Sequence, residues 1–162
     1  MKDIRSIESL IKPETYQVFL FICTAALPFV FAKHPWFVVN KKGTVSRWEV
    51  FWKTDGLKTS WGHLHKDHYA LFQGVEMFVF SDKYHWNNTE LVGVVEGDED
   101  SLAKRMAEFI ENSPQAYPYC SRYVLGGPNS NSYAQWVLNK FPESNMRLPW
   151  NSFGKSAAPK LV

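Results

Sequence analysis

Ser130 and His34 are the residues of this sequence whose types suit nucleophilic catalysis. Ser130 lies in the string GGPNSNSY, residues 126–133, which precedes an amphipathic segment and predicts the beginning of a helix. A helix N-terminus presents free N–H groups and a partial positive charge, which stabilise a developing anion and suit a nucleophile. A serine also needs a general base within hydrogen-bond reach and a third group that orients the base. The candidates are His34 as base and Glu49 as orienting group, with Asn40 as a weaker choice for the latter.

The same residues also have a purely structural interpretation. Asn and Ser are preferred helix-capping residues, and Gly-Gly-Pro is ordinary turn chemistry. A single histidine before a proline, as His34 stands before Pro35, is more often a hydrogen-bonded structural residue than a catalyst. Spacing alone therefore favours capping over catalysis.

Polar and aromatic side chains near Ser130 suggest a binding cleft. The residues predicted to bind a ligand there are Asn129, Asn131, Tyr117, Tyr119, Cys120 and Arg122, with Tyr123 beside them. The alternative is that the tyrosines pack in the core and that Arg122 forms a surface ion pair. Cys120 is the other nucleophile of this region, and a buried structural cysteine is the commoner outcome.

A second cluster is the string HLHKDH, in which His63, His65 and His68 are candidate metal ligands. Its HxHxDH pattern resembles the metallo-β-lactamase superfamily, in which such residues hold a pair of zinc ions. A solvated histidine-rich loop is the favoured alternative. The chain is short for that fold, His85 is the one histidine that follows the string, and the preceding KTSWG is not a hydrophobic strand. We therefore expect no cofactor and no metal, and a metal-dependent hydrolase that uses this string is the least favoured of three functional hypotheses.

The composition is that of a globular domain. The 162 residues are 45% hydrophobic and 21% charged, values that suit one domain with a sizeable core. We expect one domain over residues 1–162, with its core at about 16–153 and a partly disordered tail after Phe153. The net charge of +2 and the scattered basic residues argue against a nucleic-acid partner. The two cysteines, Cys23 and Cys120, are too few for a disulfide scaffold.

The order of the elements predicts an α+β fold with an antiparallel sheet of four to six strands flanked by helices. Hydrophobic patterning predicts strands at 16–23, 29–39, 47–53, 76–80 and 90–97, and helices at 3–12, 98–113 and 129–141. NKKG, residues 40–43, predicts a turn, and residues 54–74 predict a long loop. The apolar run 16–31 is shorter than a membrane-spanning helix and contains Pro28. We therefore expect no transmembrane segment and a cytoplasmic protein.

A family resemblance adds weight to the Ser130 region. The string YPYCSRY, followed by GPNSN, a helix, LP and GK, resembles the bacterial domain of unknown function 3750. Upstream, HPWFVV and the following WEV are similar to the same family. The resemblance covers roughly residues 16–156 and implies little about activity, because that family is uncharacterised.

The chain also resembles, more distantly, the circularly permuted papain-like proteins related to the NlpC/P60 hydrolases. In those proteins a strand histidine precedes an Asn-Cys-Asn-like string that opens a helix, and Ser130 stands here in place of the cysteine. The resemblance implies a hydrolase or acyltransferase for an amide or ester, with Ser130 as nucleophile, His34 as base and Glu49 as orienting group. A serine is far less acidic than a cysteine, so the alternative is an inactive relative that binds a small molecule, peptide, lipid or glycan.

Overall fold

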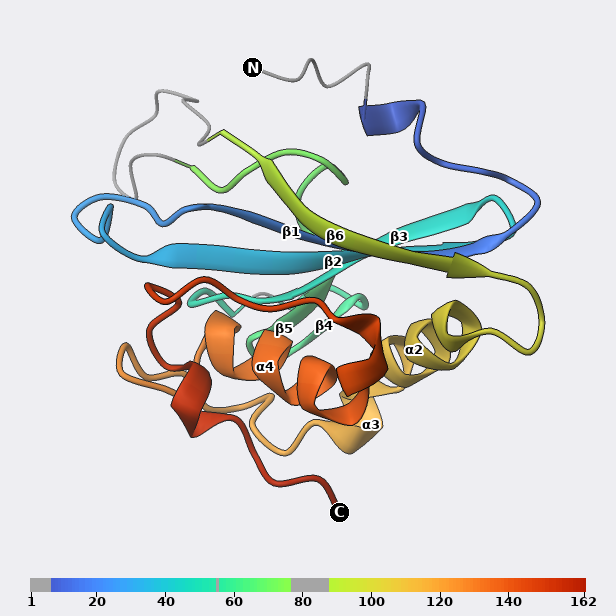
Figure 1. Cartoon of the computed structure of the whole chain (residues 1–162). Helices are drawn as coiled ribbons and strands as arrows, with labels where there is room; N and C mark the ends of the chain where they lie inside the picture. Colours follow the sequence, from blue (N-terminus) through green and yellow to red (C-terminus); the bar gives the residue numbers. More distant parts are fainter. Residues whose placement is uncertain (1–6, 55, 77–87) are drawn as a thin grey trace.

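The computed structural model of the chain describes residues 7–54, 56–76 and 88–162 and has a six-stranded antiparallel sheet at its centre (Figure 1). The strand order is β4-β5-β3-β2-β1-β6. The strands are β1 Tyr16–Thr24, β2 Lys33–Lys41, β3 Thr44–Val50, β4 Ser60–Trp61, β5 Leu64–Lys66 and β6 Glu90–Gly97. The expected α+β fold with an antiparallel sheet is thereby confirmed.

A tight turn sets the register between β2 and β3. Lys41 pairs with Thr44, so Lys42 and Gly43 alone form the loop. Both residues have positive φ, 51° and 93°, which is the backbone geometry that two-residue hairpins favour because it matches the twist of the strands. The predicted turn at 40–43 is confirmed. The pair farthest from this turn is Phe37 with Trp48. The first residues of β2, from Lys33 to Trp36, are therefore not paired with β3.

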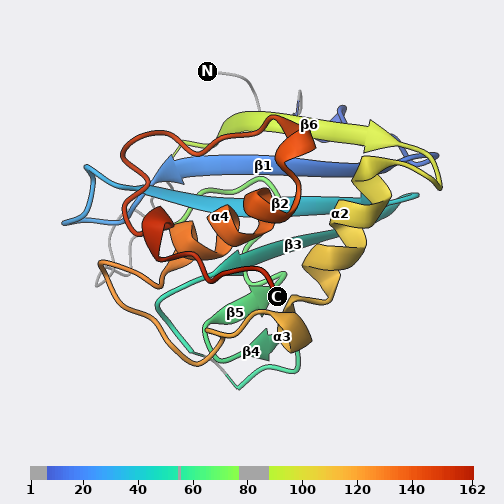
Figure 2. The same ribbon diagram turned by 60° about the horizontal axis from the view of Figure 1, so that its bottom comes forward.

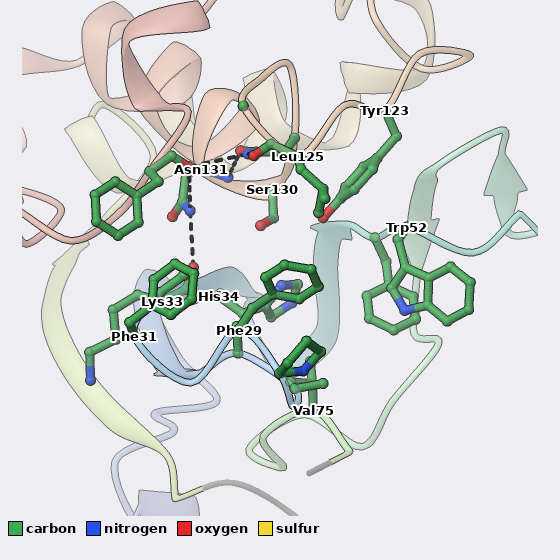
Figure 3. A pocket seen from close by; sticks show the side chains of 18 of the residues that line it. Phe29, Phe31, Lys33, His34, Trp52, Val75, Tyr123, Leu125, Ser130 and Asn131 are labelled. Carbon is green, nitrogen blue, oxygen red and sulfur yellow. Dashed lines mark hydrogen bonds between the residues drawn. The ribbon is translucent and has the colours of Figure 1, made fainter. Parts of the chain in front are cut away.

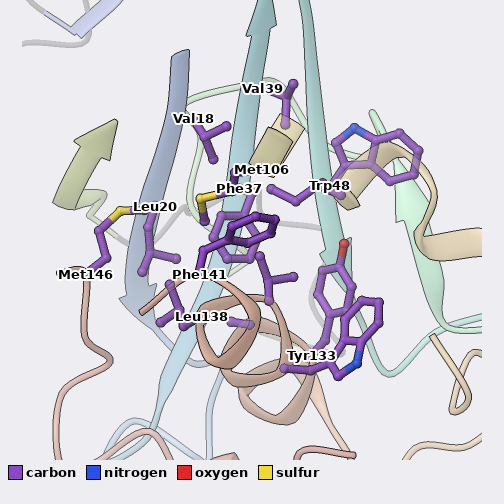
Figure 4. Close-up of a cluster of buried hydrophobic side chains, with 14 of the residues drawn as sticks. Val18, Leu20, Phe37, Val39, Trp48, Met106, Tyr133, Leu138, Phe141 and Met146 are labelled. Carbon is purple, nitrogen blue, oxygen red and sulfur yellow. The ribbon is translucent and has the colours of Figure 1, made fainter. Parts of the chain in front are cut away.

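The helices cover one face of the sheet (Figure 2). They are α2 Leu102–Glu111, the single turn α3 Ser113–Ala116, and α4 Ser130–Lys140. Alternate residues of β1, namely Val18, Leu20 and Ile22, point to this face and form a core with the apolar sides of α2 and α4 (Figure 4). Burial of this apolar area is the main stabilising contribution expected for such a layer.

The opposite face has its own, smaller apolar cluster. Phe19, Phe21 and Cys23 of β1 lie there with Trp36 of β2, and the segment around Phe72 packs over them. Burial raises the pKa of the Cys23 thiol to about 12, which removes it as a nucleophile at neutral pH. The central strands β1 and β2 are therefore buried on both faces, by helices on one side and by irregular chain on the other.

Four expectations about the elements need correction. The second strand begins at Lys33, because residues 25–32 form a loop closed by a bond from Ala25 N to Ala32 O of 3.0 Å. The third strand runs over Thr44–Val50 and ends before Trp52. The expected loop at 54–74 contains β4 and β5, which extend the sheet beyond β3. Residues 77–80 of the expected strand at 76–80 lie outside the described residues, as do residues 3–6 of the expected helix at 3–12. Within 7–12 the chain is helical at residues 7–8 alone, and a turn follows them.

The tail after Phe153 is folded, contrary to expectation. It forms a 3-10 turn at Lys155–Ala157 that packs against α4. Ser132 Oγ donates a hydrogen bond of 2.6 Å to the carbonyl of Gly154, and this bond anchors the tail to the first turn of α4. Among the helices in the described part of the chain, none is long and apolar enough to cross a bilayer.

Candidate functional site

A pocket of about 690 Å³ lies where the loop between β1 and β2 meets the beginning of α4. The other walls come from the segment after β3, from His63 and from Phe153. Figure 3 shows Ser130 and Tyr123 on one side of this pocket, with His34 and Phe29 facing them from the other. The pocket therefore gathers segments that lie far apart in the sequence.

His34 is held by a buried carboxylate. Its Nε2 lies 2.6 Å from Glu49 Oε2, and Arg47 Nε donates to Glu49 Oε1 at 2.7 Å. Burial by itself would raise the pKa of Glu49, but the Arg47 charge and the His34 hydrogen bond outweigh it and lower this pKa to about 2. Because the carboxylate is ionised and can only accept, Nε2 must carry the imidazole proton in this bond. In the neutral ring, Nδ1 is then the basic nitrogen.

The end of the β2–β3 ladder explains how His34 reaches the pocket. His34 stacks on Trp36, at 6.2 Å between ring centroids, and so lies on the face opposite the helices. The pairing of β2 with β3 begins at Phe37, so β3 does not pair with β2 at His34. The His34 ring lies at this unpaired end of β2 and lines the same pocket as Ser130. Among the described residues, no hydrogen bond joins His34 to Ser130.

Ser130 is the first residue of α4 and lies beside Tyr123. Burial raises the pKa of Tyr123 to about 12, and the interaction with Ser130 opposes part of that rise. The phenol is therefore protonated at neutral pH and can donate a hydrogen bond. In the described part of the chain, the backbone N–H of Ser130 has no hydrogen-bond partner.

Asn129 caps α4, as the sequence suggested. Its Oδ1 accepts from the N–H of Asn131 at 3.0 Å and of Ser132 at 3.3 Å, and Ser132 Oγ accepts from the N–H of Asn129. This reciprocal pattern is a capping box. Because the cap occupies two amides of the first turn, they are not available to an oxyanion, and the expectation that the helix start supplies several such donors needs correction.

Asn131 ties the helix start to two distant segments. Its Nδ2 donates to the carbonyl of Lys33 and to that of Phe153, both at 2.9 Å. Its Oδ1 is buried and has no hydrogen-bond partner among the described residues. Asn129 and Asn131 both line the pocket, but their bonded atoms act mainly to hold its walls together.

Gly154 lets the tail lie close to the Asn129 side chain, and we expect its replacement to destabilise the protein. Gly154 has a φ of 92°, and a Cβ there would overlap the Asn129 carboxamide. Gly154→Ala should therefore lower the free energy of unfolding by about 1–3 kcal/mol through backbone strain. Denaturant titration measures this. Gly56→Ala is the control, because a Cβ on Gly56 meets no atom within 4 Å. Equal stability of the two variants would contradict the role given to Gly154.

Four predicted binding residues lie outside the pocket. Tyr117 is buried against Tyr133 and the rest of the core, at 5.1 Å between ring centroids. Cys120 Sγ lies 3.3 Å from the carbonyl of Tyr117, and burial raises its thiol pKa. Arg122 is exposed and lies over the ring of Tyr119 at 6.0 Å. The prediction that these four line the cleft is wrong for this pocket, because that segment turns its side chains to the core and to solvent. Tyr123 does line it.

The histidine string does not assemble a metal site. Both ring nitrogens of His65 are used, by Ser60 Oγ and by the carbonyl of Lys53, each at 2.8 Å. His63 Nδ1 lies 3.0 Å from the carbonyl of Phe51 and donates to it. Within residues 7–54, 56–76 and 88–162, no three His, Cys, Asp or Glu side chains are placed to hold a metal ion. Hydrogen bonds from His63 and His65 instead join the β5 region to the segment after β3.

Sequence reasoning missed His63 and the apolar loop as parts of the pocket. The composition of FVFA predicts a strand for the second half of the loop at residues 25–32. The HxHxDH pattern points to His63 as a metal ligand alone, yet its ring lies 5.4 Å from that of Tyr123 and lines the pocket. The signal available was Pro28 and the small residues before it, which are typical of a turn.

A family model described as "Protein of unknown function (DUF3750)" matches residues 15–157. Neither the curated proteins nor the solved structures include a match to the chain. The match covers most of the chain, including β1, the pocket and the anchored tail. The chain therefore belongs to the DUF3750 family.

Proposed function

We propose that this protein is a serine-type hydrolase or acyltransferase that acts on an ester or amide. Ser130 is the nucleophile, His34 the general base and Glu49 the orienting group. The observation that carries the proposal is the 2.6 Å bond between His34 and Glu49 on a ring that lines the same pocket as Ser130. The order of a strand histidine before a helix-opening nucleophile is the further support for a permuted papain-like relationship.

The proposed reaction has two steps. Ser130 Oγ attacks the carbonyl carbon while His34 Nδ1 takes its proton, and the leaving group departs with that proton, which leaves an acyl-serine. Water or another alcohol or amine then attacks the acyl carbon and regenerates Ser130. Glu49, ionised because its pKa is about 2, stabilises the imidazolium form of His34 in both steps.

Two donors are proposed for the oxyanion. One is the Ser130 N–H at the positive end of α4. The other is the hydroxyl of Tyr123, which stays protonated because burial raises its pKa to about 12. Tyr123 thereby replaces the amides that the Asn129 cap has taken.

A binding protein without catalysis is the second candidate. It is favoured by the missing hydrogen bond between His34 and Ser130 in the described chain and by the capped amides at the helix start. Catalytic hydrogen bonds are often long in a free enzyme and shorten when substrate binds, so the two candidates differ in reactivity rather than in resting geometry.

Covalent labelling distinguishes the two candidates. A fluorophosphonate probe, which phosphonylates activated serines with loss of fluoride, is expected to add once to the wild-type protein at Ser130. Intact-mass spectrometry and peptide mapping locate the adduct. Ser130→Ala should abolish it, and Ser121→Ala, at an exposed serine outside the pocket, should leave it unchanged. A folded wild type that stays unlabelled after prolonged exposure to the probe would favour the binding protein.

A further inference from the structure

We propose that the pocket binds the apolar chain of an amphiphile, so that the reacting group is the ester or amide of a medium- or long-chain acyl group. The chemical step rests on the proposed function above. The binding of the chain rests on the pocket alone and is tested separately. Three observations support it: the lining, the distribution of polar groups, and the exposed rim.

The pocket lining is almost uncharged. Lys33 is the one Lys, Arg, Asp or Glu among the described residues that line it, and the rest are mainly apolar or aromatic. Transfer of a charged or strongly polar ligand into such a lining leaves its polar groups without partners, at a cost in free energy. A nucleotide, a sugar or a charged peptide is therefore a poor match.

Polar groups face one another across one part of the pocket. Ser130 and Tyr123 lie opposite His34, whereas Val75 and Trp52 form other parts of the wall (Figure 3). A ligand that matches this distribution has one carbonyl group at the Ser130 side and an apolar remainder. The volume of about 690 Å³ is in the range of small-molecule pockets and too small for a folded partner.

The rim of the pocket continues the apolar surface outwards. Phe31 and Leu125 are 61% and 63% exposed and both line the pocket. The rings of Phe31 and Phe153 lie 5.9 Å apart, and Trp150, 81% exposed, lies 6.2 Å from Phe153. Contiguous exposed apolar residues of this kind mark a binding surface. Here they are continuous with the pocket, so an acyl chain can enter from solution or directly from a lipid layer.

The chain-length dependence of hydrolysis tests the substrate class. For p-nitrophenyl esters from acetate to dodecanoate, kcat/KM should rise about two- to fourfold per added methylene until the pocket is filled. Phe31→Ser should reduce this dependence, and Ala26→Trp, which fills the pocket, should move the optimum to shorter esters. Val94→Ser on β6 is the control, because Val94 is also an exposed apolar residue, at 44%, but lies outside the pocket.

Binding without turnover is measured on Ser130→Ala. Laurate, below its aggregation concentration, should bind with a change in the tryptophan fluorescence, because Trp52 lines the pocket. Ala26→Trp should weaken that binding in isothermal titration calorimetry. Co-sedimentation with phosphatidylcholine vesicles would identify a bilayer as the source of the chain, and laurate binding without co-sedimentation would identify a free amphiphile. Laurate binding with no esterase activity would uphold this inference and overturn the proposed function. Absence of both laurate and vesicle binding, or activity that is independent of chain length, would overturn the inference.

Discussion

Glu49→Gln is expected to lower the free energy of unfolding by about 3–5 kcal/mol, the usual cost of removing one partner from a buried ion pair. Glu49 is 1% exposed and Arg47 is fully buried. Arg47 also donates to the carbonyls of Ala70 and Gln73, so its guanidinium cannot leave for solvent without breaking the cover of that sheet face. The glutamine keeps the volume and removes the charge, which leaves a buried cation without a counter-ion.

Denaturant titration at pH 7 measures this effect. Glu108→Gln is the matched control, since its carboxylate is 54% exposed and lies 3.7 Å from Lys104 Nζ, and surface pairs of this kind contribute less than about 1 kcal/mol. A Glu49→Gln protein as stable as Glu108→Gln would show that Arg47 is satisfied by its carbonyl partners alone.

The pH dependence of the free energy of unfolding at acidic pH independently tests the role of Glu49. The pKa of Glu49 lies at about 2 in the folded protein, below its ordinary value of 4.5. A lowered folded-state pKa means that the stabilisation is fully present above about pH 4.5 and is lost as the pH falls towards 2. Wild-type stability should therefore decrease across that window, and Glu49→Gln should lack this part of the decrease.

The second large effect is expected at His34. If His34 is the base for Ser130, His34→Asn should lower kcat for a p-nitrophenyl ester by about 10²- to 10⁴-fold, the usual contribution of a general base. KM should change little, because the imidazole acts on the proton of Ser130 rather than on the acyl chain. Labelling of Ser130 by the fluorophosphonate should slow in the same variant.

His63→Asn is the comparison that makes this result specific. His63 lines the same pocket, but its Nδ1 donates to the carbonyl of Phe51 and no carboxylate holds it among the described residues. His63→Asn should therefore lower kcat far less than His34→Asn does. A larger loss in His63→Asn than in His34→Asn would transfer the role of base to His63. Thermal melting of both variants controls for unfolding.

The regular elements were predictable because their patterns are local. The apolar runs of β1 and β6, the apolar side of α2 and the Asn-Ser cap of α4 each follow from residues close together in sequence. The turn at Lys42 and Gly43 is equally local. Ser130, His34 and Glu49 could be selected as candidates because few residue types perform nucleophilic chemistry.

The surroundings of the candidate site were not predictable, because long-range contacts determine them. Tyr117 and Tyr123 lie in one aromatic string, and only the packing of that string under α4 decides that the first is in the core and the second in the pocket. His65 has the spacing of a metal ligand, and only its contacts with Lys53 and Ser60 show that both of its ring nitrogens are occupied. The fold of the tail likewise depends on the bond from Ser132 to Gly154, which joins residues 22 apart.

The two hydrogen bonds that Asn131 Nδ2 donates to the carbonyls of Lys33 and Phe153 have a consequence for biosynthesis. The wall at residues 25–34 leaves the ribosome when the α4 segment is still untranslated, and the pocket cannot close until Phe153 and Gly154 have been added and docked. Nascent chains that stop before residue 153 would hold His34 and Ser130 without a common pocket. The walls of the pocket are therefore joined only in a chain that has been translated through residue 154.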